Sequence, residues 1–252
     1  MRISPETLQV LDNCRVDGQI VFINGQLDRP VYEAVNKVLE AIGGKWNRKA
    51  KGHVFEDNPA ERLDMAILTG DVVDRKKEFQ FFETPNELAD ELVAAAQLED
   101  GELICEPSAG RGRIVRAIHR AVRDARVFAV ELDPENVKKL SYLAETGPAF
   151  RVIIGDFLDI EWKAPFDAIC MNPPFRNGAD VDHVTHAFSL LRPGGRLAAV
   201  VSESPFFRTT AKANGFRQLV DAHGYSEKLP EQSFSSSGTG VNTRMVVLRR
   251  PA

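Results

Sequence analysis

Short apolar runs alternate with segments of helical periodicity over residues 102–250. This alternation is typical of βαβ units and of a parallel sheet. Strands are expected at residues 103–106, 126–131, 150–154, 166–171 and 196–202, with two more near residue 225 and at residues 241–248. Helices are expected at residues 114–122, 133–145, 180–191 and 212–222, with a turn at residues 193–195. The pattern therefore predicts an α/β fold with a doubly wound, mainly parallel, seven-stranded sheet.

Residues 1–78 have a different pattern, which predicts a small α+β module. Ser4-Pro5 is a typical helix start, with the serine as N-cap and the proline in the first turn. A short apolar run is expected at residues 19–23, a β-hairpin at residues 45–55, and helices at residues 31–42 and 59–68. A charge-rich linker at residues 71–78 then leads to the second domain, residues 79–252.

One more helix is expected to open the second domain. Thr84 is predicted to be its N-cap, Pro85 its first helical residue and Glu87 the return partner of a capping box. The helix is expected to continue to Gln97 and to bury Leu88 and its helical neighbours.

Composition excludes several classes of protein. An apolar content of 43% and a charged content of 27% are ordinary for a soluble globular chain. No run approaches the roughly 18 apolar residues of a membrane span, and the N-terminus has no secretory pattern, so a cytoplasmic protein is expected. The three cysteines are far apart and His183 and His186 lack a third ligand, so neither a disulfide nor a metal site is predicted.

Polar residues follow four of the predicted strands at the point where each strand ends. They are Glu106, Glu131, Asp156 and Asn172. Ligands of open α/β sheets bind beyond the carboxyl ends of the strands. A loop of small residues follows Glu106 and allows a ligand to approach the backbone closely; it comprises Pro107, Ser108, Ala109, Gly110, Arg111 and Gly112. These strand ends are therefore the candidate ligand site.

The chemistry of the strand ends indicates one ligand. Glu106 would repel a pyrophosphate and suits a cationic amine, Glu131 suits a ribose diol, and Asp156 suits the exocyclic amine of adenine. A cationic amino acid joined to ribose and adenine is S-adenosyl-L-methionine. The alternative is that Glu131 is solvated and Asp156 only caps a turn.

Asn172 opens the stretch Asn172-Pro173-Pro174-Phe175. The two prolines fix their own φ angles and force the preceding residues into an extended conformation. A side-chain amide, free backbone carbonyls and an aromatic ring on one rigid hook suit the recognition of a planar amine. The alternative is a proline-rich loop that merely leaves a strand, since a short motif is only a hypothesis.

Taken together, residues 79–250 resemble the amino-group methyltransferases of nucleic acid, which have the class I, Rossmann-like S-adenosylmethionine-dependent fold. Among these the chain is most similar to DNA adenine-N6 methyltransferases with an Asn-Pro-Pro-Phe motif. The resemblance rests on five segments in order: Phe82-Glu83-Thr84-Pro85, Glu106-Pro107-Ser108-Ala109-Gly110-Arg111-Gly112, Glu131-Leu132-Asp133-Pro134, Gly155-Asp156-Phe157 and Asn172-Pro173-Pro174-Phe175.

The resemblance implies a role for each segment. Thr84 and Pro85 would line the methionine end of the cofactor, and Gly110 and Gly112 would let the backbone approach it. Glu131, followed by Leu132, would hold the ribose, and Asp156 with Phe157 the adenine. Asn172 and Pro173 would accept the two N–H groups of the target amine, while Phe175 would stack on a flipped base. Phe234 would be a second aromatic beside that base, unless it folds onto the core.

The substrate is expected to be DNA, but other acceptors remain open. Cytosine-N4 in DNA, guanine-N2 or adenine-N6 in RNA, and the glutamine of release factors are methylated by similar hooks, although the glutamine enzymes usually have tyrosine at the position of Phe175. A DNA-binding protein that keeps the fold without turnover is another class. Since the chain stops at Ala252, a nuclease or a recognition domain after the last strand is not expected.

Recognition of nucleic acid would then fall to the module at residues 1–78. Its predicted hairpin carries Trp46 among four cations, Lys45, Arg48, Lys49 and Lys51, and these suit phosphates and an unstacked base. The alternative is that Trp46 and Phe55 fill the module's own core while the cations are only solvated. The net charge of −4 makes the placement of these cations more informative than their number.

Overall fold

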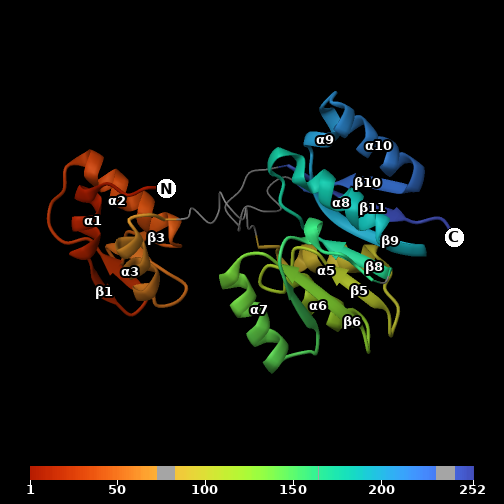
Figure 1. Cartoon of the computed structure of the whole chain (residues 1–252), viewed down its shortest axis with the longest axis horizontal. Coiled ribbons are helices and arrows are strands. Elements are labelled where there is room, and N and C mark those ends of the chain that lie inside the picture. Colours follow the sequence, from red (N-terminus) through yellow and green to blue (C-terminus); the bar gives the residue numbers. More distant parts are fainter. Residues whose placement is uncertain (73–82, 164, 231–241) are drawn as a thin grey trace. The chain divides into compact units, whose positions relative to one another are not determined.

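The computed structural model describes residues 1–72, 83–163, 165–230 and 242–252. Phe234, the predicted second aromatic, and Phe82 lie outside the described residues. The chain divides into two compact units, Met1–Glu78 and Phe79–Ala252 (Figure 1). No helix within the described residues is long and apolar enough to cross a membrane.

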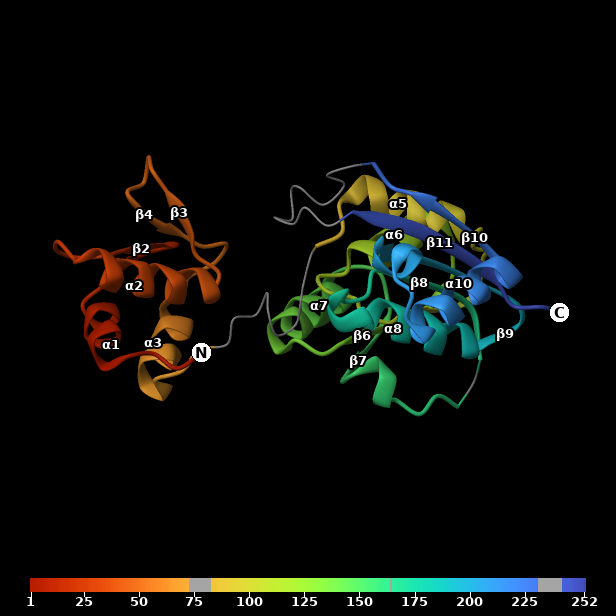
Figure 2. The same cartoon turned by 90° about the horizontal axis from the view of Figure 1, so that it is seen from above.

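Within its described residues, the first unit combines three helices with a four-stranded antiparallel sheet of order β1-β2-β4-β3. Figure 2 shows these helices and the strands β2, β3 and β4. The backbone N–H of Thr7 donates to the Ser4 side chain at 3.2 Å, which confirms the predicted N-cap. Strand β1 was not predicted because its three residues show no apolar run. The elements are α1 (Pro5–Asp12), β1 (Arg15–Asp17), β2 (Ile20–Phe22), α2 (Arg29–Ala41), β3 (Lys45–Asn47), β4 (Gly52–Val54) and α3 (Ala60–Thr69).

The predicted hairpin is formed by β3 and β4, with Trp46 opposite His53. The two aromatic residues of this stretch separate. Phe55 is 3% exposed and belongs to the core with Val21, Val35 and Leu39, whereas Trp46 is 48% exposed. The expectation that both rings fill the core is therefore right for Phe55 alone.

The second unit contains the predicted seven-stranded sheet, with order β10-β11-β9-β8-β5-β6-β7. Among the described strands of this sheet, six run in one direction, and β11 runs antiparallel to both of its neighbours, β9 and β10. The predicted doubly wound, mainly parallel fold is thus confirmed. The strands are β5 (Leu103–Glu106), β6 (Arg126–Glu131), β7 (Arg151–Ile154), β8 (Phe166–Met171), β9 (Leu191–Ser202), β10 (Gly224–Lys228) and β11 (Thr243–Arg249).

Helices cover both faces of this sheet. One face packs on α5 (Asn86–Ala95), α6 (Arg113–Ala121) and α7 (Pro134–Thr146), and the other on α8 (Ala179–Ser189) and α10 (Ala211–His223) (Figure 1). Consecutive residues of β8 alternate between the faces, since Ala168 and Cys170 contact the first set and Ile169 and Met171 the second. Both sides of β8 are apolar, which is why it reads as a continuous hydrophobic run. The described part of the unit also contains short helical segments: η1 (Phe157–Asp159), η2 (Arg176–Gly178) and α9 (Ser204–Phe207).

The predicted boundary between α8 and the next strand is wrong. The helix ends at Ser189, and Leu191 already pairs with Phe166 of β8, so β9 begins five residues before the expected Arg196. The predicted turn at residues 193–195 is a bulge within the strand, because the next pair in register is Ala168 with Arg196. Gly194 takes a φ of 75° there, a conformation that glycine adopts without strain.

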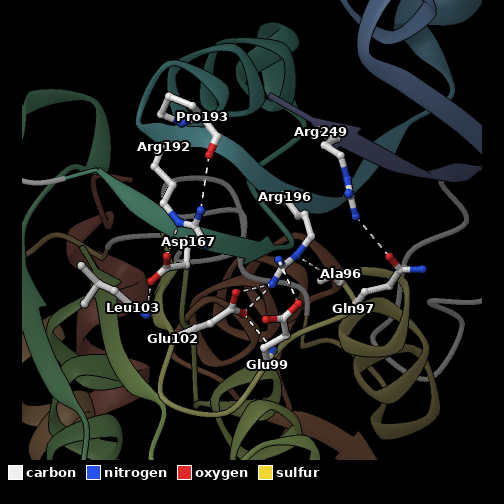
Figure 3. Close-up of polar contacts among 10 residues, drawn as sticks. All are labelled: Ala96, Gln97, Glu99, Glu102, Leu103, Asp167, Arg192, Pro193, Arg196 and Arg249. Atoms are coloured by element: carbon white, nitrogen blue, oxygen red, sulfur yellow. Dashed lines mark hydrogen bonds and ion pairs between the residues drawn. The ribbon is translucent and has the colours of Figure 1, made fainter. Parts of the chain in front are cut away.

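A buried ion pair aligns the amino-terminal side of this sheet (Figure 3). Nη2 of Arg196 donates to both carboxylate oxygens of Glu102 at 2.5 Å, and Nε donates to the Ala96 carbonyl at 3.0 Å. Both charged residues are 7% exposed. The contacts join the C-terminal end of α5, the start of β5 and β9. They lie at the edge of the sheet opposite to the strand ends that carry Glu106 and Glu131.

Candidate functional site

The strand order brings three predicted site residues to one place. β8, β5 and β6 are neighbours and parallel, so Asn172, Glu106 and Glu131 follow or end adjacent strands at the same edge of the sheet. From β5 the chain proceeds to β6 and β7 on one side, and then continues with β8 and β9 on the other. The site therefore lies at the topological switch point, where open α/β sheets bind ligands.

A cavity opens at this point. Its lining includes most of the predicted site residues, and it brings the small-residue loop, the acidic strand ends and the proline hook together. The lining residues are Glu83, Thr84, Glu106, Ser108, Ala109, Gly110, Arg111, Arg113, Glu131, Asn136, Asn172, Pro173, Pro174 and Phe175. Pro85, Pro107, Gly112, Leu132, Asp156 and Phe157 were also predicted as site residues but are not among the residues that line it.

Glu106 is a buried acid in this cavity. It is 1% exposed, and its Oε2 has no hydrogen-bond partner among the described residues. Burial raises the pKa of this carboxyl well above its usual value; the backbone N–H of Val115 opposes the shift and the charge of Glu131 adds to it. A buried acceptor without a partner is costly, so the position is suited to a ligand that brings a donor or a positive charge.

Glu131 is held by the backbone on both oxygens. Oε2 accepts from the Gly110 N–H at 2.6 Å, and Oε1 accepts from the N–H groups of Leu132 and Asp133 at 2.9 and 2.7 Å. Burial raises the pKa of Glu131, and these backbone N–H groups oppose the shift. The carboxylate thus fixes the loop after β5 to the end of β6, and it keeps one acceptor position on Oε2 for a ligand.

The two predicted loop glycines have different reasons to be glycine. Gly110 has a φ of 53° and points its N–H at Glu131. Gly112 has a φ of 77°, and a Cβ there would lie 2.7 Å from Leu143 Cδ2 and 3.0 Å from Leu140 Cδ1. Gly112 therefore permits the close packing of the loop on α7. Only Gly110 of the two lines the cavity.

Thr84 does not cap α5, contrary to prediction. Pro85 is the N-cap, with an extended backbone (φ −56°, ψ 148°), so the helix begins at Asn86 and the capping box with Glu87 is absent. The Thr84 hydroxyl instead accepts a hydrogen bond from Nδ2 of Asn172 at 3.0 Å. Thr84 is 7% exposed and lies in the cavity. The Thr84 side chain, which the local sequence predicts to cap the helix, thus makes a tertiary contact instead.

The predicted adenine-binding pair lies beyond the lining of the cavity. Asp156 caps η1 by accepting from the Leu158 N–H at 2.9 Å. The Phe157 ring is 2% exposed and packs against Trp162, His183 and His186. Contact between Phe157 and a ligand is therefore restricted to its backbone. The two histidines are aromatic neighbours in this core, and no group of three metal-ligating residues occurs in the described parts of the chain.

Two polar cavity residues were not singled out from the sequence. Arg113 donates to Glu83 Oε1 and to Asn86 Oδ1, both at 2.9 Å, and so closes the side of the cavity next to Thr84. Asn136, in the first turn of α7, is 2% exposed, and its Nδ2 has no partner within the described residues. A polar residue just after a helix N-cap resembles an ordinary solvated position, so only the fold identifies it.

The donor set of the cavity fits the cofactor predicted from the sequence. Glu106 Oε2 is a buried acceptor and Asn136 Nδ2 a buried donor, each without a protein partner. S-adenosylmethionine carries both an ammonium group, which needs an acceptor, and hydroxyl oxygens, which need donors. The residues present therefore match the polar groups of that molecule.

The hairpin cations of the first unit are all on the surface. Lys45, Arg48, Lys49 and Lys51 are exposed, and Asn47 shapes the turn by accepting from the Lys49 and Ala50 N–H groups at 2.9 and 3.0 Å. Trp46 rests edge-on against the buried His53, with ring centroids 5.3 Å apart. The indole of Trp46 therefore packs on His53 and remains partly exposed to solvent.

The second unit is similar in sequence to methyltransferases. Residues 104–195 match the family described as a methyltransferase domain. An rRNA methyltransferase of Streptomyces thermotolerans is 34% identical over 108 residues, which are 42% of this chain and 35% of that protein. A Methanosarcina mazei protein named probable ribosomal RNA small subunit methyltransferase A is 30% identical over 172 residues, 65% of this chain and 60% of that one. This chain thus spans between about a third and 60% of the length of these relatives.

A solved structure of a type I restriction–modification system shares the fold. Its TM-score is 0.59 at 20% identity, and the match covers 88% of this chain and 50% of that chain. Together with the family match over residues 104–195, this likeness confirms the predicted class I methyltransferase fold of the second unit. The residues that bind the cofactor and the molecule that receives the methyl group are questions of the proposed function.

Proposed function

We propose that the chain transfers a methyl group from S-adenosylmethionine to the exocyclic N6 amine of adenine in DNA. The observation that carries this proposal is that Asn172 lies in one cavity with Glu106 and Thr84. Glu106 ends β5 and Asn172 follows β8, and these two neighbouring strands flank the switch point. The cofactor, when bound, supplies an electrophilic sulfonium methyl group. The hook at residues 172–175 supplies the groups that a planar amine requires.

The electronics of the amine define the task of the hook. Its lone pair is delocalised into the base, so the amine is a weak nucleophile. Asn172 Oδ1 and the Pro173 carbonyl accept its two N–H groups, which favours a localised lone pair and fixes the direction of attack. Phe175, which is half-buried at the cavity, stacks on the base after it leaves the duplex. Pro174 keeps the two acceptors and the ring on a rigid backbone.

Thr84 gives the amide of Asn172 its orientation. Because the threonine hydroxyl accepts from Nδ2, the amide cannot turn its nitrogen toward the substrate without losing that bond. Oδ1 is then the atom presented to the incoming amine. Thr84 therefore acts through Asn172 as a positioning residue.

The acidic strand ends hold the cofactor. Glu106 faces its ammonium group, since a cation offsets the cost of burying that carboxylate. Glu131 accepts from the ribose on the free position of Oε2, and Asp156 accepts from the adenine amine at the outer end of the site. The loop from Pro107 to Gly112 and Leu132 provide the surrounding backbone and apolar contact, and Pro85 holds Thr84 in place.

The second candidate is methylation of a base in RNA. Both curated relatives described above are named as ribosomal RNA methyltransferases, at 30% and 34% identity. The DNA assignment has different support: the Glu-Pro-Ser-Ala-Gly segment, the Asn-Pro-Pro-Phe hook and the similarity of fold to a type I restriction–modification system. The two candidates share the cavity and differ only in the nucleic acid.

The hairpin of the first unit binds the nucleic acid backbone in this proposal. Four exposed cations surround one exposed indole, an arrangement that suits phosphates together with one stacked or wedged base. The buried His53 supports the indole from beneath. Such contacts are largely independent of sequence, so low sequence specificity is expected from this element.

Nucleoside mass spectrometry tests the acceptor directly. The purified chain is incubated with isotopically labelled S-adenosylmethionine and either unmethylated DNA or RNA, and the product nucleosides are identified. N6-methyldeoxyadenosine supports the leading proposal. N4-methyldeoxycytidine, or a methylated ribonucleoside alone, would replace it with the corresponding acceptor.

Asn172→Ala is the matched control. The variant is expected to bind cofactor like the wild type and to transfer no measurable methyl. Transfer at the wild-type rate by this variant would refute the role of the hook. Cofactor binding without transfer by the wild type to any nucleic acid would indicate a binding protein that keeps the fold.

A further inference from the structure

Asn136 occupies a position where a polar side chain is costly. It lies in the first turn of α7, three residues after the N-cap Asp133, which satisfies the helix start by accepting from the Glu135 N–H at 3.0 Å. Asn136 is 2% exposed, and its Nδ2 has no partner within the described residues. A buried donor left unpaired costs about 1–3 kcal/mol. The amide is therefore not explained by the stability of the helix or of the core.

The surroundings of Asn136 indicate what the donor serves. It lines the same cavity as Glu106 and Glu131. The Glu131 carboxylate already accepts from three backbone N–H groups, so it can accept one further hydrogen bond on Oε2. A ribose hydroxyl that donates to Oε2 still has lone pairs on its own oxygen. Buried lone pairs need a donor, and Asn136 Nδ2 is a buried donor in this cavity without a partner among the described residues.

We propose that Asn136 is a further cofactor-binding residue, whose Nδ2 donates to a hydroxyl oxygen of the cofactor's ribose. Glu131 and Asn136 then bind the diol from both sides of the hydrogen bond. The carboxylate accepts a hydrogen bond from a ribose hydroxyl, and the amide of Asn136 donates a hydrogen bond to a hydroxyl oxygen. This inference rests on the cofactor and is independent of the methyl acceptor. It deepens the proposed function by adding a residue that selects for the ribose.

A structural role and a binding role for Asn136 predict opposite effects of one substitution. Asn136→Leu removes an unpaired buried donor and keeps a similar volume, so the cofactor-free protein is expected to be as stable as the wild type or more stable. The same substitution is expected to weaken cofactor binding about tenfold, the equivalent of one hydrogen bond. A side chain that served only the fold would lower stability and leave affinity unchanged.

Calorimetric titration of the full chain tests the proposal. The probes are S-adenosylhomocysteine, which has the same adenosine and does not react, and its 2′-deoxy and 3′-deoxy analogues. Asn136→Leu is compared with the wild type and with Glu135→Gln, a polar change in the same helical turn outside the cavity. The wild type is expected to lose affinity for one of the deoxy analogues, and the loss is expected to be smaller in Asn136→Leu, where the hydroxyl of the parent keeps only its hydrogen bond to Glu131.

Three results would overturn the inference. One is wild-type affinity of Asn136→Leu for S-adenosylhomocysteine. Another is a loss for both deoxy analogues that is as large in the variant as in the wild type, which would separate Asn136 from the ribose. The third is absence of binding by the wild type, which would also remove the assigned cofactor residues. Failure to methylate nucleic acid, with these titrations as expected, would refute the acceptor alone.

Discussion

Thr84 and Asn172 lie 88 residues apart in the chain and are joined by a hydrogen bond of 3.0 Å from Nδ2 to the threonine hydroxyl. The contact ties the segment before α5 to the end of β8. Both residues line the cavity, so the hydrogen bond lies within the candidate site. It fixes which atom of the amide is available for an amine.

Thr84→Val is expected to lower kcat while leaving cofactor affinity nearly unchanged. Valine keeps the shape and removes the acceptor, so the Asn172 amide loses its fixed orientation, at a cost of about tenfold to a hundredfold in kcat. Thr84→Ser keeps a hydroxyl and is expected to restore most of the rate. Single-turnover transfer and cofactor titration separate the two effects. Equal kcat for wild type and Thr84→Val would contradict the positioning role.

Glu106→Gln is expected to stabilise the cofactor-free protein increasingly as the pH rises. Because burial holds the pKa of Glu106 above the ordinary value of 4.5, its contribution to stability is complete below that value and is lost as the pH rises through the folded-state pKa. Glutamine does not titrate. The difference in Tm between variant and wild type is therefore expected to widen as the pH rises above the ordinary glutamate pKa of 4.5.

The same variant is expected to bind S-adenosylmethionine at least about tenfold more weakly at neutral pH, since the ammonium group loses a charged partner. Glu135→Gln, outside the cavity, should show neither effect. A Tm difference that does not vary with pH would indicate that Glu106 is not the titrating group.

Lys49→Glu combined with Lys51→Glu is expected to weaken nucleic acid binding and to make it less dependent on salt. If each lysine contacts one phosphate, the slope of log affinity against log salt falls by about 1.8 for duplex DNA. Fluorescence anisotropy over a range of salt concentrations measures the slope. Arg29→Glu with Lys37→Glu makes the same charge change on α2 of the same unit. An unchanged slope in the hairpin variant would show that these lysines are only solvated and do not contact phosphates.

Arg196→Met is expected to destabilise the protein by about 3–5 kcal/mol, because Glu102 would remain buried without its charged partner. Arg192 pairs with Asp167 nearby but its side chain is 45% exposed, so Arg192→Met is expected to cost much less stability than Arg196→Met (Figure 3). Urea denaturation of the two variants gives the comparison. Similar losses from both would show that burial does not set the strength of these pairs.

The repeat of apolar positions along the chain, and the polar residues at the strand ends, made much of the second unit predictable from sequence. A buried run followed by Glu106, Glu131 or Asn172 needs only the rule that parallel strands end at one edge. The alternation of faces along β8 and the apolar runs on both sides of the sheet follow from the same pattern. Local sequence therefore specified the sheet and the two acids within the cavity.

Residues whose partners lie far away in sequence were not predictable in this way. Thr84 stands in a sequence that is typical of a helix N-cap, yet its hydroxyl accepts a hydrogen bond from the side chain of Asn172, 88 residues later. Asn136 looks like a solvated first-turn residue because nothing in the sequence of α7 reveals that it is buried at the cavity. Leu191 continues a helical period, but its pairing with Phe166 decides the start of β9.

The hairpin illustrates a limit of a different kind. Trp46 and Phe55 are both aromatic residues in a basic stretch, and only strand pairing separates the exposed ring from the buried one. β3 is the edge strand of its sheet, so Trp46 lacks a neighbouring strand on its outer side. Sequence therefore indicated a candidate surface without deciding which ring belongs to it.

If the methyl donor binds at Glu106 and Glu131 as proposed, these buried acids would link the stability of the protein to that donor. Without a cation, the burial of Glu106 and Glu131 destabilises the folded state. A ligand that binds only the folded state stabilises it by about 1.4 kcal/mol for each tenfold excess over its Kd. In a cell short of the donor, a larger fraction of the chains is then unfolded and open to proteases. Supply of the donor would set the number of surviving molecules as well as their rate of turnover.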